Sequence, residues 1–390
     1  MNKLRILITF FLFVYTATII HAQGDKNPKG DFNPLIVGVP SLTIAPDARG
    51  GAMGDAGAAT DPDIYSQYWN PAKYAFAFSK AGIGLSYTPW LQRLVSDIDL
   101  VYLSGYYKFG NDRSAIASSV RYFSLGQIDM RDYDGNIIQA VNPYEMALDV
   151  GYSLKTSETF SIGATMRFIY SDLGSGVEEL YPGSAWAFDI AGYYNNYFMV
   201  GSGECLFGLG IVASNIGSKI SYDEGNTSNF IPTKLKLGAS LLFPMDGYNK
   251  IAFTLDANKY MIPTPPDTEG MTPQDKKDTL EEYFAISPIS GIFKSFTDAP
   301  GGAKEKFREI MWSAGTEYSY LDQFFVRGGY FYEHPTKGNR QYFSVGAGFK
   351  LTSLQLDVAY LISTVPSNPL DQTLRFSLSF DMDGLRNLTK

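Results

Sequence analysis

Cysteine, histidine and charged residues are scarce in this 390-residue sequence. There is one cysteine, Cys205, there are two histidines, and charged residues make up 18% of the chain, compared with about 25% in typical soluble domains. A lone cysteine excludes a disulfide framework. The net charge of −8 argues against a nucleic-acid partner, because nucleic-acid-binding domains present a basic surface.

Long apolar runs are also missing beyond the first residues. Lys3 and Arg5 precede a short apolar stretch at residues 6–14, and the segment ends at Ala22. This order predicts a secretory signal peptide over residues 1–22; an uncleaved anchor is the alternative, although the run is short for a membrane span. No later run reaches the roughly 18 apolar residues of a spanning helix, so we expect no transmembrane helix.

Aromatic residues and glycine, by contrast, are abundant. Phe and Tyr contribute 27 residues each, and there are 38 glycines. A disordered chain has few aromatics, so this composition indicates a folded protein. An exported, aromatic-rich chain without helical spans is either a secreted β-protein or an outer-membrane β-barrel.

Much of the chain alternates between large apolar and small or polar residues, with the period of two that is typical of β-strands. The second face carries mainly Gly, Ser and Ala with isolated charges of both signs, whereas a soluble sandwich usually exposes many Lys, Glu and Thr side chains. Such a face fits the lumen of a membrane barrel, where space is limited and charges pair. The isolated charges are Asp149, Arg167, Asp189, Asp256, Arg327, Asp357 and Arg375.

About fourteen segments have this pattern and the length of roughly ten residues that a tilted membrane strand needs. We therefore predict an all-β fold, a transmembrane antiparallel β-barrel of about 14 strands within residues 81–383, followed by a periplasmic tail at 384–390. The segments lie near 82–90, 97–108, 114–124, 146–155, 159–171, 185–195, 205–214, 233–244, 249–260, 311–320, 323–333, 341–350, 353–362 and 372–382.

The connections between these segments are alternately short and long. Short periplasmic turns and long outer loops are typical of outer-membrane barrels. This assignment requires the first strand to run outward, which places residues 23–80 on the periplasmic side. The connection at 196–204 is an exception, because it is longer than the short periplasmic turn expected at this place in the alternation.

The segment before the first strand is compact in composition. Residues 46–78 are rich in small residues and poor in charge, which suggests that they need a confined environment. Pro71 restricts Asn70 to extended conformations, and an Asn side chain can close a local turn. Because the lumen of a fourteen-stranded barrel is too wide for wall side chains to fill, we predict that residues 23–80 form an N-terminal arm and a lumenal hatch.

This segment resembles the N-terminal hatch of FadL-like outer-membrane transporters, which are fourteen-stranded barrels with a plug built around an Asn-Pro-Ala box. The box here is Asn70, Pro71 and Ala72, followed by Lys73 where Gly is frequent in that family. The other matching elements are Ala48-Arg49, Ala52-Met53-Gly54, Ala56-Gly57 and Asp61.

Within that family, the arm at residues 34–42 and the segment at 45–54 are most similar to the PorV family of Bacteroidetes. The resemblance implies an outer-membrane component of the type IX secretion system, in contact with lipid and lipopolysaccharide. It would receive cargo carrying a C-terminal sorting domain from the translocon and pass it to the surface attachment machinery. The fold alone leaves a channel for hydrophobic small molecules as the alternative. A third hypothesis, lipopolysaccharide modification, would need a set of catalytic residues that the sequence does not show.

Residues typical of catalytic or metal sites are few. In the processed chain His334 is the only histidine, and it lies in a predicted loop; a Ser-His-Asp triad would have to use it. The carboxylate pairs Glu178-Glu179 and Glu281-Glu282 fall in predicted outer loops, where solvated charge clusters are the simpler interpretation. We therefore expect neither enzymatic activity nor a cofactor or metal site.

The longest connection, residues 261–310, has a pattern of its own. A structureless loop of this size is uncommon unless it is functional. Thr272, Pro273 and Asp275 predict a helix start, and apolar residues follow at the spacing of short amphipathic helices. We interpret this excursion as the partner-docking element; the alternative is a cap that packs on the barrel's own rim. The candidate docking residues are Ile289, Ile292, Phe293 and Phe296.

Overall fold

The computed structural model describes most of the chain. The predicted signal peptide at residues 1–22 and the predicted tail at 384–390 lie outside the described part. No helix of the described part is both long and apolar enough to cross a membrane. The described residues are 33–131, 134, 136–174, 181–201, 203–223, 225, 227–266, 268, 270–366 and 368–382.

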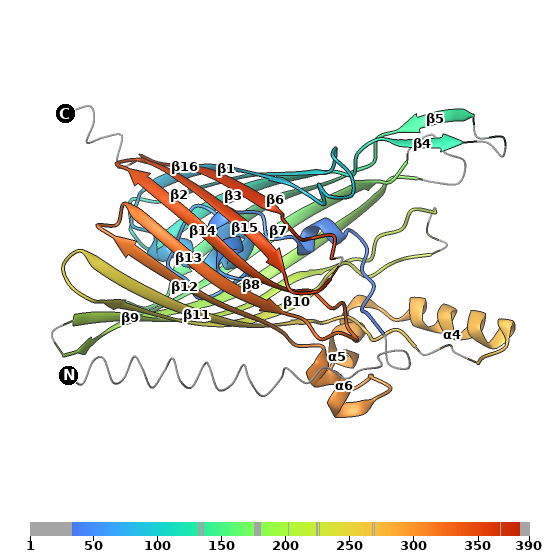
Figure 1. The fold of residues 1–390 in the computed structure, drawn as a ribbon. Helices are drawn as coiled ribbons and strands as arrows, with labels where there is room; N and C mark the ends of the chain where they lie inside the picture. Colours follow the sequence, from blue (N-terminus) through green and yellow to red (C-terminus); the bar gives the residue numbers. More distant parts are fainter. Residues whose placement is uncertain are drawn as a thin grey trace.

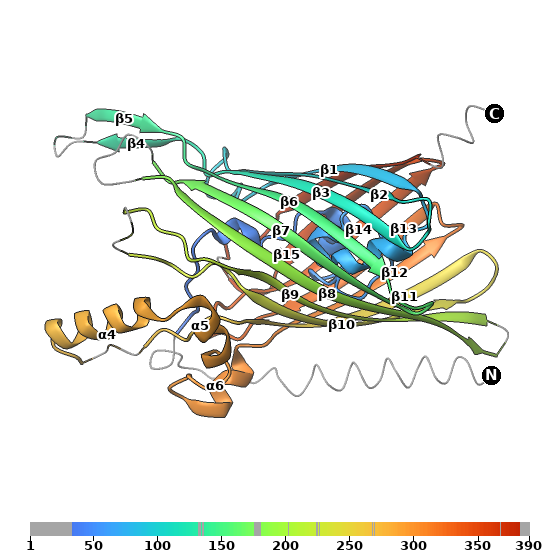
Figure 2. The same cartoon turned by 180° about the vertical axis from the view of Figure 1, so that it is seen from behind.

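Fourteen antiparallel strands close into one barrel (Figures 1 and 2), which confirms the predicted fold. These strands are β1 (Ala81–Pro89), β2 (Asp99–Lys108), β3 (Ser114–Ser124), β6 (Tyr144–Lys155), β7 (Phe160–Asp172), β8 (Gly183–Val200), β9 (Gly203–Gly217), β10 (Lys234–Pro244), β11 (Asn249–Tyr260), β12 (Met311–Tyr320), β13 (Phe324–Tyr332), β14 (Gln341–Leu351), β15 (Leu354–Ser363) and β16 (Leu374–Asp381). Pairing between β1 and β16 closes the ring.

The alternation places apolar side chains outside and small or charged ones in the lumen. In β7, Ile162 and Met166 are 45% and 46% exposed on the outer surface, whereas Thr165 and Arg167 are buried. An apolar exterior is what contact with lipid requires. All seven charges assigned to the lumen from the sequence are buried, none more than 5% exposed.

The two ends of the barrel differ, as the loop lengths predict. The expected exception at residues 196–204 is wrong, because β8 continues to Val200 and β9 begins at Gly203, so this connection is also tight. The long connection between β3 and β6 holds a two-stranded sheet outside the barrel, β4 (Ile128–Arg131) and β5 (Ile137–Val141), which the sequence did not predict.

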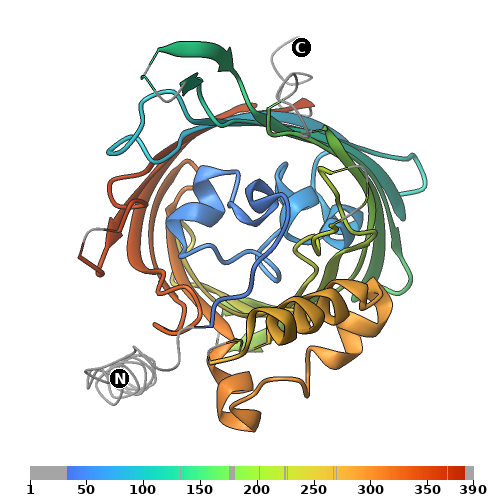
Figure 3. The same ribbon diagram turned by 90° about the vertical axis from the view of Figure 1, so that its right-hand side faces the viewer.

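The N-terminal segment runs through the lumen (Figure 3). It contains four short helical elements, η1 (Pro40–Thr43), α2 (Ala48–Ala52), α3 (Ser66–Trp69) and η2 (Pro71–Phe76). We call residues 33–45 the arm and residues 46–80 the hatch.

The arm enters at the long-loop end. The backbone N–H of Asn33 donates to the carbonyl of Thr336 at 3.0 Å, in the loop between β13 and β14. At the other end, Lys108 Nζ donates to the Ala77 carbonyl at 2.8 Å, beside the tight turn after β2. The expectation that the whole segment begins on the periplasmic side is therefore wrong for its described part. The apolar arm residue Leu35 packs against a cluster of buried residues near the long-loop end, including Phe230.

Three helices form the excursion between β11 and β12: α4 (Pro273–Ala285), α5 (Pro288–Lys294) and α6 (Gly302–Arg308). They lie beside the mouth at the long-loop end and do not cross its centre (Figure 3). The predicted helix start is confirmed, because the Thr272 side chain caps α4 by accepting from the Asp275 N–H.

Candidate functional site

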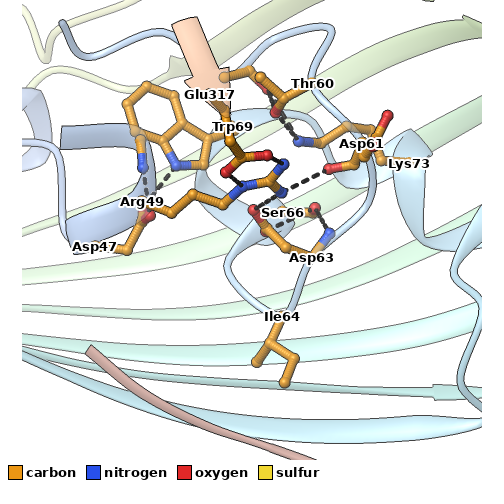
Figure 4. A network of polar contacts seen from close by, with 12 residues as sticks. Asp47, Arg49, Thr60, Asp61, Asp63, Ile64, Ser66, Trp69, Lys73 and Glu317 are labelled. Carbon is orange, nitrogen blue, oxygen red and sulfur yellow. Dashed lines mark hydrogen bonds and ion pairs between the residues drawn. The ribbon is translucent and has the colours of Figure 1, made fainter. Parts of the chain in front are cut away.

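An arginine of the hatch is bound to the barrel wall through shared carboxylates (Figure 4). Arg49 on α2 donates to both carboxylate oxygens of Glu317 on β12, at 3.0 and 2.9 Å, and to Asp63 Oδ2 at 3.0 Å. Glu317 also accepts from Arg327 Nε of β13 at 2.5 Å. Bidentate arginine–carboxylate pairs are strong and directional, so this network fixes α2 against two strands.

Asp47 organises the start of the hatch. Its Oδ2 caps α2 by accepting from the Gly50 N–H at 2.8 Å, and its Oδ1 accepts from Trp69 Nε1 at 2.6 Å. Burial raises the pKa of Asp47 to about 6 and the nearby Asp63 carboxylate acts in the same direction, whereas these two hydrogen bonds oppose both. One side chain thus joins two turns of the hatch that lie 22 residues apart.

The Asn-Pro-Ala box lies in the lumen, in contact with the wall. Asn70 Oδ1 accepts from the Ala72 N–H at 3.0 Å and so caps η2, which Pro71 begins. Asn70 Nδ2 donates to the carbonyls of Ala58 at 2.9 Å and Gly192 of β8 at 3.1 Å. The Asn70 side chain is fully buried and joins the local helix start, a distant hatch turn and the wall.

Lys73, the departure from the familiar box, is also fully buried. Its Nζ donates to the Gly57 carbonyl and to Thr60 Oγ1, both at 3.0 Å. Burial lowers the pKa of Lys73. The lysine therefore holds the turn at residues 57–60 from inside the hatch.

Inward-facing glycines give the hatch room to approach the wall. A Cβ at Gly210 of β9 would lie 1.9 Å from the Ala58 carbonyl oxygen, and one at Gly163 of β7 would lie 2.6 Å from the Ala72 nitrogen. Real Cβ atoms do not reach such distances, so only glycine fits these positions. Other wall glycines with hatch atoms as near neighbours are Gly82, Gly84, Gly151, Gly208, Gly238, Gly315, Gly329 and Gly346.

The space left between the N-terminal segment and the wall is small. The two best-formed cavities of the described part each hold little more than a water-sized particle, and charged or polar side chains form much of their lining. They therefore offer no apolar path through the lumen wide enough for an aromatic ring.

The four candidate docking residues lie on or next to α5, and we call them the α5 face. Ile289, Phe293 and Phe296 are 59%, 73% and 46% exposed, while Ile292 is half-buried. The opposite side of α5 packs through a residue without a side chain. Gly291 is buried, and a Cβ there would lie 3.0 Å from Pro263 and 3.2 Å from Phe230. Ile289 and Phe293 thus point away from the barrel rim, whereas the Phe296 ring centre lies 5.6 Å from Lys259 Nζ of β11.

Ion pairs hold the excursion together and fix it to the rim. Lys306 Nζ of α6 lies 2.5 Å from Asp298 Oδ1 and donates to Thr264 Oγ1 at 2.8 Å. Lys259 Nζ, at the outer end of β11, lies 2.6 Å from Glu309 Oε2. Since these groups are largely buried, the contacts hold the excursion, and with it the α5 face, in a fixed position.

The residues considered for catalysis are not brought together. Glu281 and Glu282 are exposed on α4, His334 Nδ1 lies 2.9 Å from Thr336 Oγ1 in a loop, and the Glu178-Glu179 pair is outside the described residues. Within the described ranges, no group of three or more His, Cys, Asp and Glu residues could hold a metal ion.

Sequence reasoning did not single out three charged residues of the lumen. Glu317 was not singled out, although it alternates in β12 with the inward-facing Ser313 and Ser319. The same inward positions contain Arg121 in β3 and Lys236 in β10, both buried. Strict application of the period of two would have found all three.

Comparison with known proteins gives one family and a set of similar folds. No curated protein matches the sequence. The toluene transporter TbuX of Ralstonia pickettii is 11% identical, with a TM-score of 0.44 over 88% of this chain and 100% of that one. The toluene transporter TodX of P. putida is 10% identical, with a TM-score of 0.48 over 86% and 98%. A FadL homologue of Pseudomonas aeruginosa is 12% identical, with a TM-score of 0.42 over 87% and 99%.

A family model described as "Type IX secretion system protein PorV" matches residues 27–267, which is more than half of the chain. The match includes the arm, the hatch and the strands β1 to β11. We conclude that the chain belongs to the PorV family and is an outer-membrane component of the type IX secretion system.

Proposed function

We propose that this protein is a non-enzymatic carrier within type IX secretion. It receives cargo with a C-terminal sorting domain from the outer-membrane translocon and passes it to the surface attachment machinery. The observation that carries the proposal is the α5 face, an apolar surface on a fixed helix at the long-loop end, which in an outer-membrane barrel faces the cell exterior.

The α5 face has the properties of a docking surface for the translocon. Large exposed apolar patches are a liability unless a partner covers them. Burying one Phe or Ile contributes about 1.5–3 kcal/mol, so two or three of these residues suffice for a firm contact. The ion pairs beneath α6 fix the surface before the partner arrives, which reduces the entropy lost on binding.

The alternative of a cap on the barrel's own rim has less support. In a capping helix the apolar side packs on the rim and the polar side faces water. Here the rim contacts Gly291, and Ser295 is fully buried, whereas Phe293 is 73% exposed.

A channel for hydrophobic small molecules also has less support. Such a channel needs an apolar route through the plug or through an opening in the wall. Each barrel strand is hydrogen-bonded to both neighbours around the ring, and the two best-formed lumenal cavities of the described part are small and lined largely by polar groups.

The test replaces Ile289, Ile292, Phe293 and Phe296 together with serine. We expect a barrel that still folds by heat-modifiable gel mobility, loses co-purification with the translocon and secretes less cargo. The control replaces three exposed apolar residues of the β4–β5 sheet, at the same end of the barrel, with serine. We expect this control to change none of these readouts. A quadruple variant that inserts and secretes normally contradicts the docking role. The control residues are Ile128, Ile137 and Ile138, which are 50%, 54% and 69% exposed.

A further inference from the structure

Three cations line one lumenal cavity without an acidic partner. They are Arg121 of β3 and Lys234 and Lys236 of β10, and the cavity lies between the wall, the arm and α3. Within the described part of the chain, none of the three forms an ion pair, whereas the lumenal arginines Arg49, Arg167, Arg327 and Arg375 all do. We call this space the cation cavity.

The carboxylates of the cation cavity are already engaged. Asp149 and Asp189 both line it, but both are bound to Arg167, with Nε–Oδ1 and Nη2–Oδ2 distances of 2.7 and 3.1 Å. Arg167 also donates to the Asn215 side chain. Arg167 is therefore the ion-pair partner of both carboxylates, and neither carboxylate forms an ion pair with the other three cations.

The arginine of the cation cavity has donor capacity to spare. Arg121 Nη1 donates to the carbonyls of Ser41 and Ile44 in the arm, at 2.6 and 3.0 Å. Its Nη2 is buried and has no hydrogen-bond partner among the described residues. The guanidinium lies 5.0 Å from the ring centre of Tyr68.

Lys236 approaches the same aromatic ring. Its Nζ donates to the Tyr68 carbonyl at 3.0 Å and lies 4.3 Å from the ring centre. Arg121 and Lys236 therefore converge on one residue of α3, and each is at most 4% exposed. Contact with an aromatic face offsets only part of the cost of removing a cation from water.

We propose that the cation cavity binds one small monovalent anion, of the size of a halide, between Arg121, Lys234 and Lys236. The cavity is too small for a fatty-acid chain or an organic phosphate. The anion compensates the unpaired positive charge and accepts from the free Arg121 Nη2. Because Arg121 holds the arm and Lys236 holds Tyr68, the anion fastens the N-terminal segment to the wall.

A direct test locates the anion. The full chain, purified in detergent, is crystallised with sodium bromide in place of chloride, and anomalous diffraction is recorded at the bromine edge. We expect a bromide peak within contact distance of Arg121 Nη2 and Lys236 Nζ. Ordered bromide only at other positions, or a cation cavity containing water alone, overturns the proposal.

A second test uses thermal unfolding in bromide at constant ionic strength, balanced with a bulky organic anion. We expect the Tm of the unmodified chain to rise and saturate with bromide, and Arg121→Gln to lose the saturating rise. The control is Lys250→Gln, which removes a half-exposed lysine paired with Asp322 at the short-turn end and should keep the full response. Equal responses of all three proteins overturn the proposal, and if Arg121→Gln does not fold, the bromide map of the unmodified chain decides.

Discussion

The hatch inside the barrel and the helical excursion outside it differ in how far their side chains are buried and bound to partners. In the hatch, Asn70 and Lys73 are buried and Arg49 is largely buried, and each is bound to two or more partners. On α5, Ile289 and Phe293 are large, apolar and exposed, with no comparable packing. These three hatch side chains therefore find their partners within the chain, whereas the α5 face is left for another molecule to cover.

The cost of each arrangement explains the difference. A buried charge is strongly destabilising when its partner is removed, so a charged plug stays in place only if its pairing is complete. An exposed aromatic costs the folded barrel little but invites association. Substitutions in the hatch should accordingly act on stability, and substitutions on the α5 face should act on binding.

The largest effect is expected for Glu317→Gln. The change removes the charge shared by Arg49 and Arg327 and leaves two buried guanidinium groups under-compensated, which should cost about 3–5 kcal/mol. We expect a lower Tm in detergent and the appearance of conductance steps in planar bilayers as the hatch loosens. The control, Asp322→Asn, removes an exposed partner of Lys250 and should cost less than about 1 kcal/mol. A Glu317→Gln protein as stable as this control would contradict the comparison.

The next effect concerns the fit between hatch and wall. Gly210→Ala places a methyl group 1.9 Å from the Ala58 carbonyl oxygen, and the backbone shift it forces should cost about 1–3 kcal/mol. Gly328→Ala is the matched control, because its nearest neighbour, the Ser344 oxygen, would lie 4.0 Å from the new carbon. Equal Tm values for the two variants would mean that the hatch does not press against the wall.

A somewhat smaller effect is expected at Asn70. Asn70→Ala removes the cap of η2 and leaves the Ala58 and Gly192 carbonyls without this donor, which should cost about 1–3 kcal/mol. Asn70→Asp should be worse than alanine, because a carboxylate oxygen would then face both carbonyls. Unfolding temperatures ranked in the opposite order would show that donation by Asn70 Nδ2 contributes little.

The sequence predicted what depends on local periodicity. The period of two identified the fourteen barrel strands, and the scattered charges on the small-residue face, such as Arg167 and Asp357, do lie in the lumen. Helix-capping chemistry at Thr272 located the start of α4. Each of these predictions needs only a few neighbouring residues.

Long-range pairing could not be predicted in the same way. Arg49 and Glu317 are 268 positions apart, and no local pattern couples them. The entry of the arm at the long-loop end depends on contacts such as that of Asn33 with Thr336. The outward orientation of Phe293 was likewise hidden, because the spacing of apolar residues defines a helix face but not which way it points.

The smallest effect on stability is expected on the α5 face itself. Phe293→Ser changes a side chain that is 73% exposed, so the free energy of unfolding should stay within about 0.5 kcal/mol of the original. If the translocon covers this ring, the same change removes about 1.5–3 kcal/mol of burial from the complex, which weakens binding by roughly tenfold or more.

Gly291→Val tests the packing of α5 against the residues beneath it. A side chain at Gly291 meets Pro263 at 3.0 Å and should push α5 from its seat at a cost of about 1 kcal/mol, with Phe293 unchanged. Unfolding temperature and co-purification with the translocon are measured for both variants. We expect Phe293→Ser to reduce association alone and Gly291→Val to reduce both. If Phe293→Ser lowers the unfolding temperature as much as Gly291→Val does, the ring packs on its own barrel and the contrast between hatch and excursion fails.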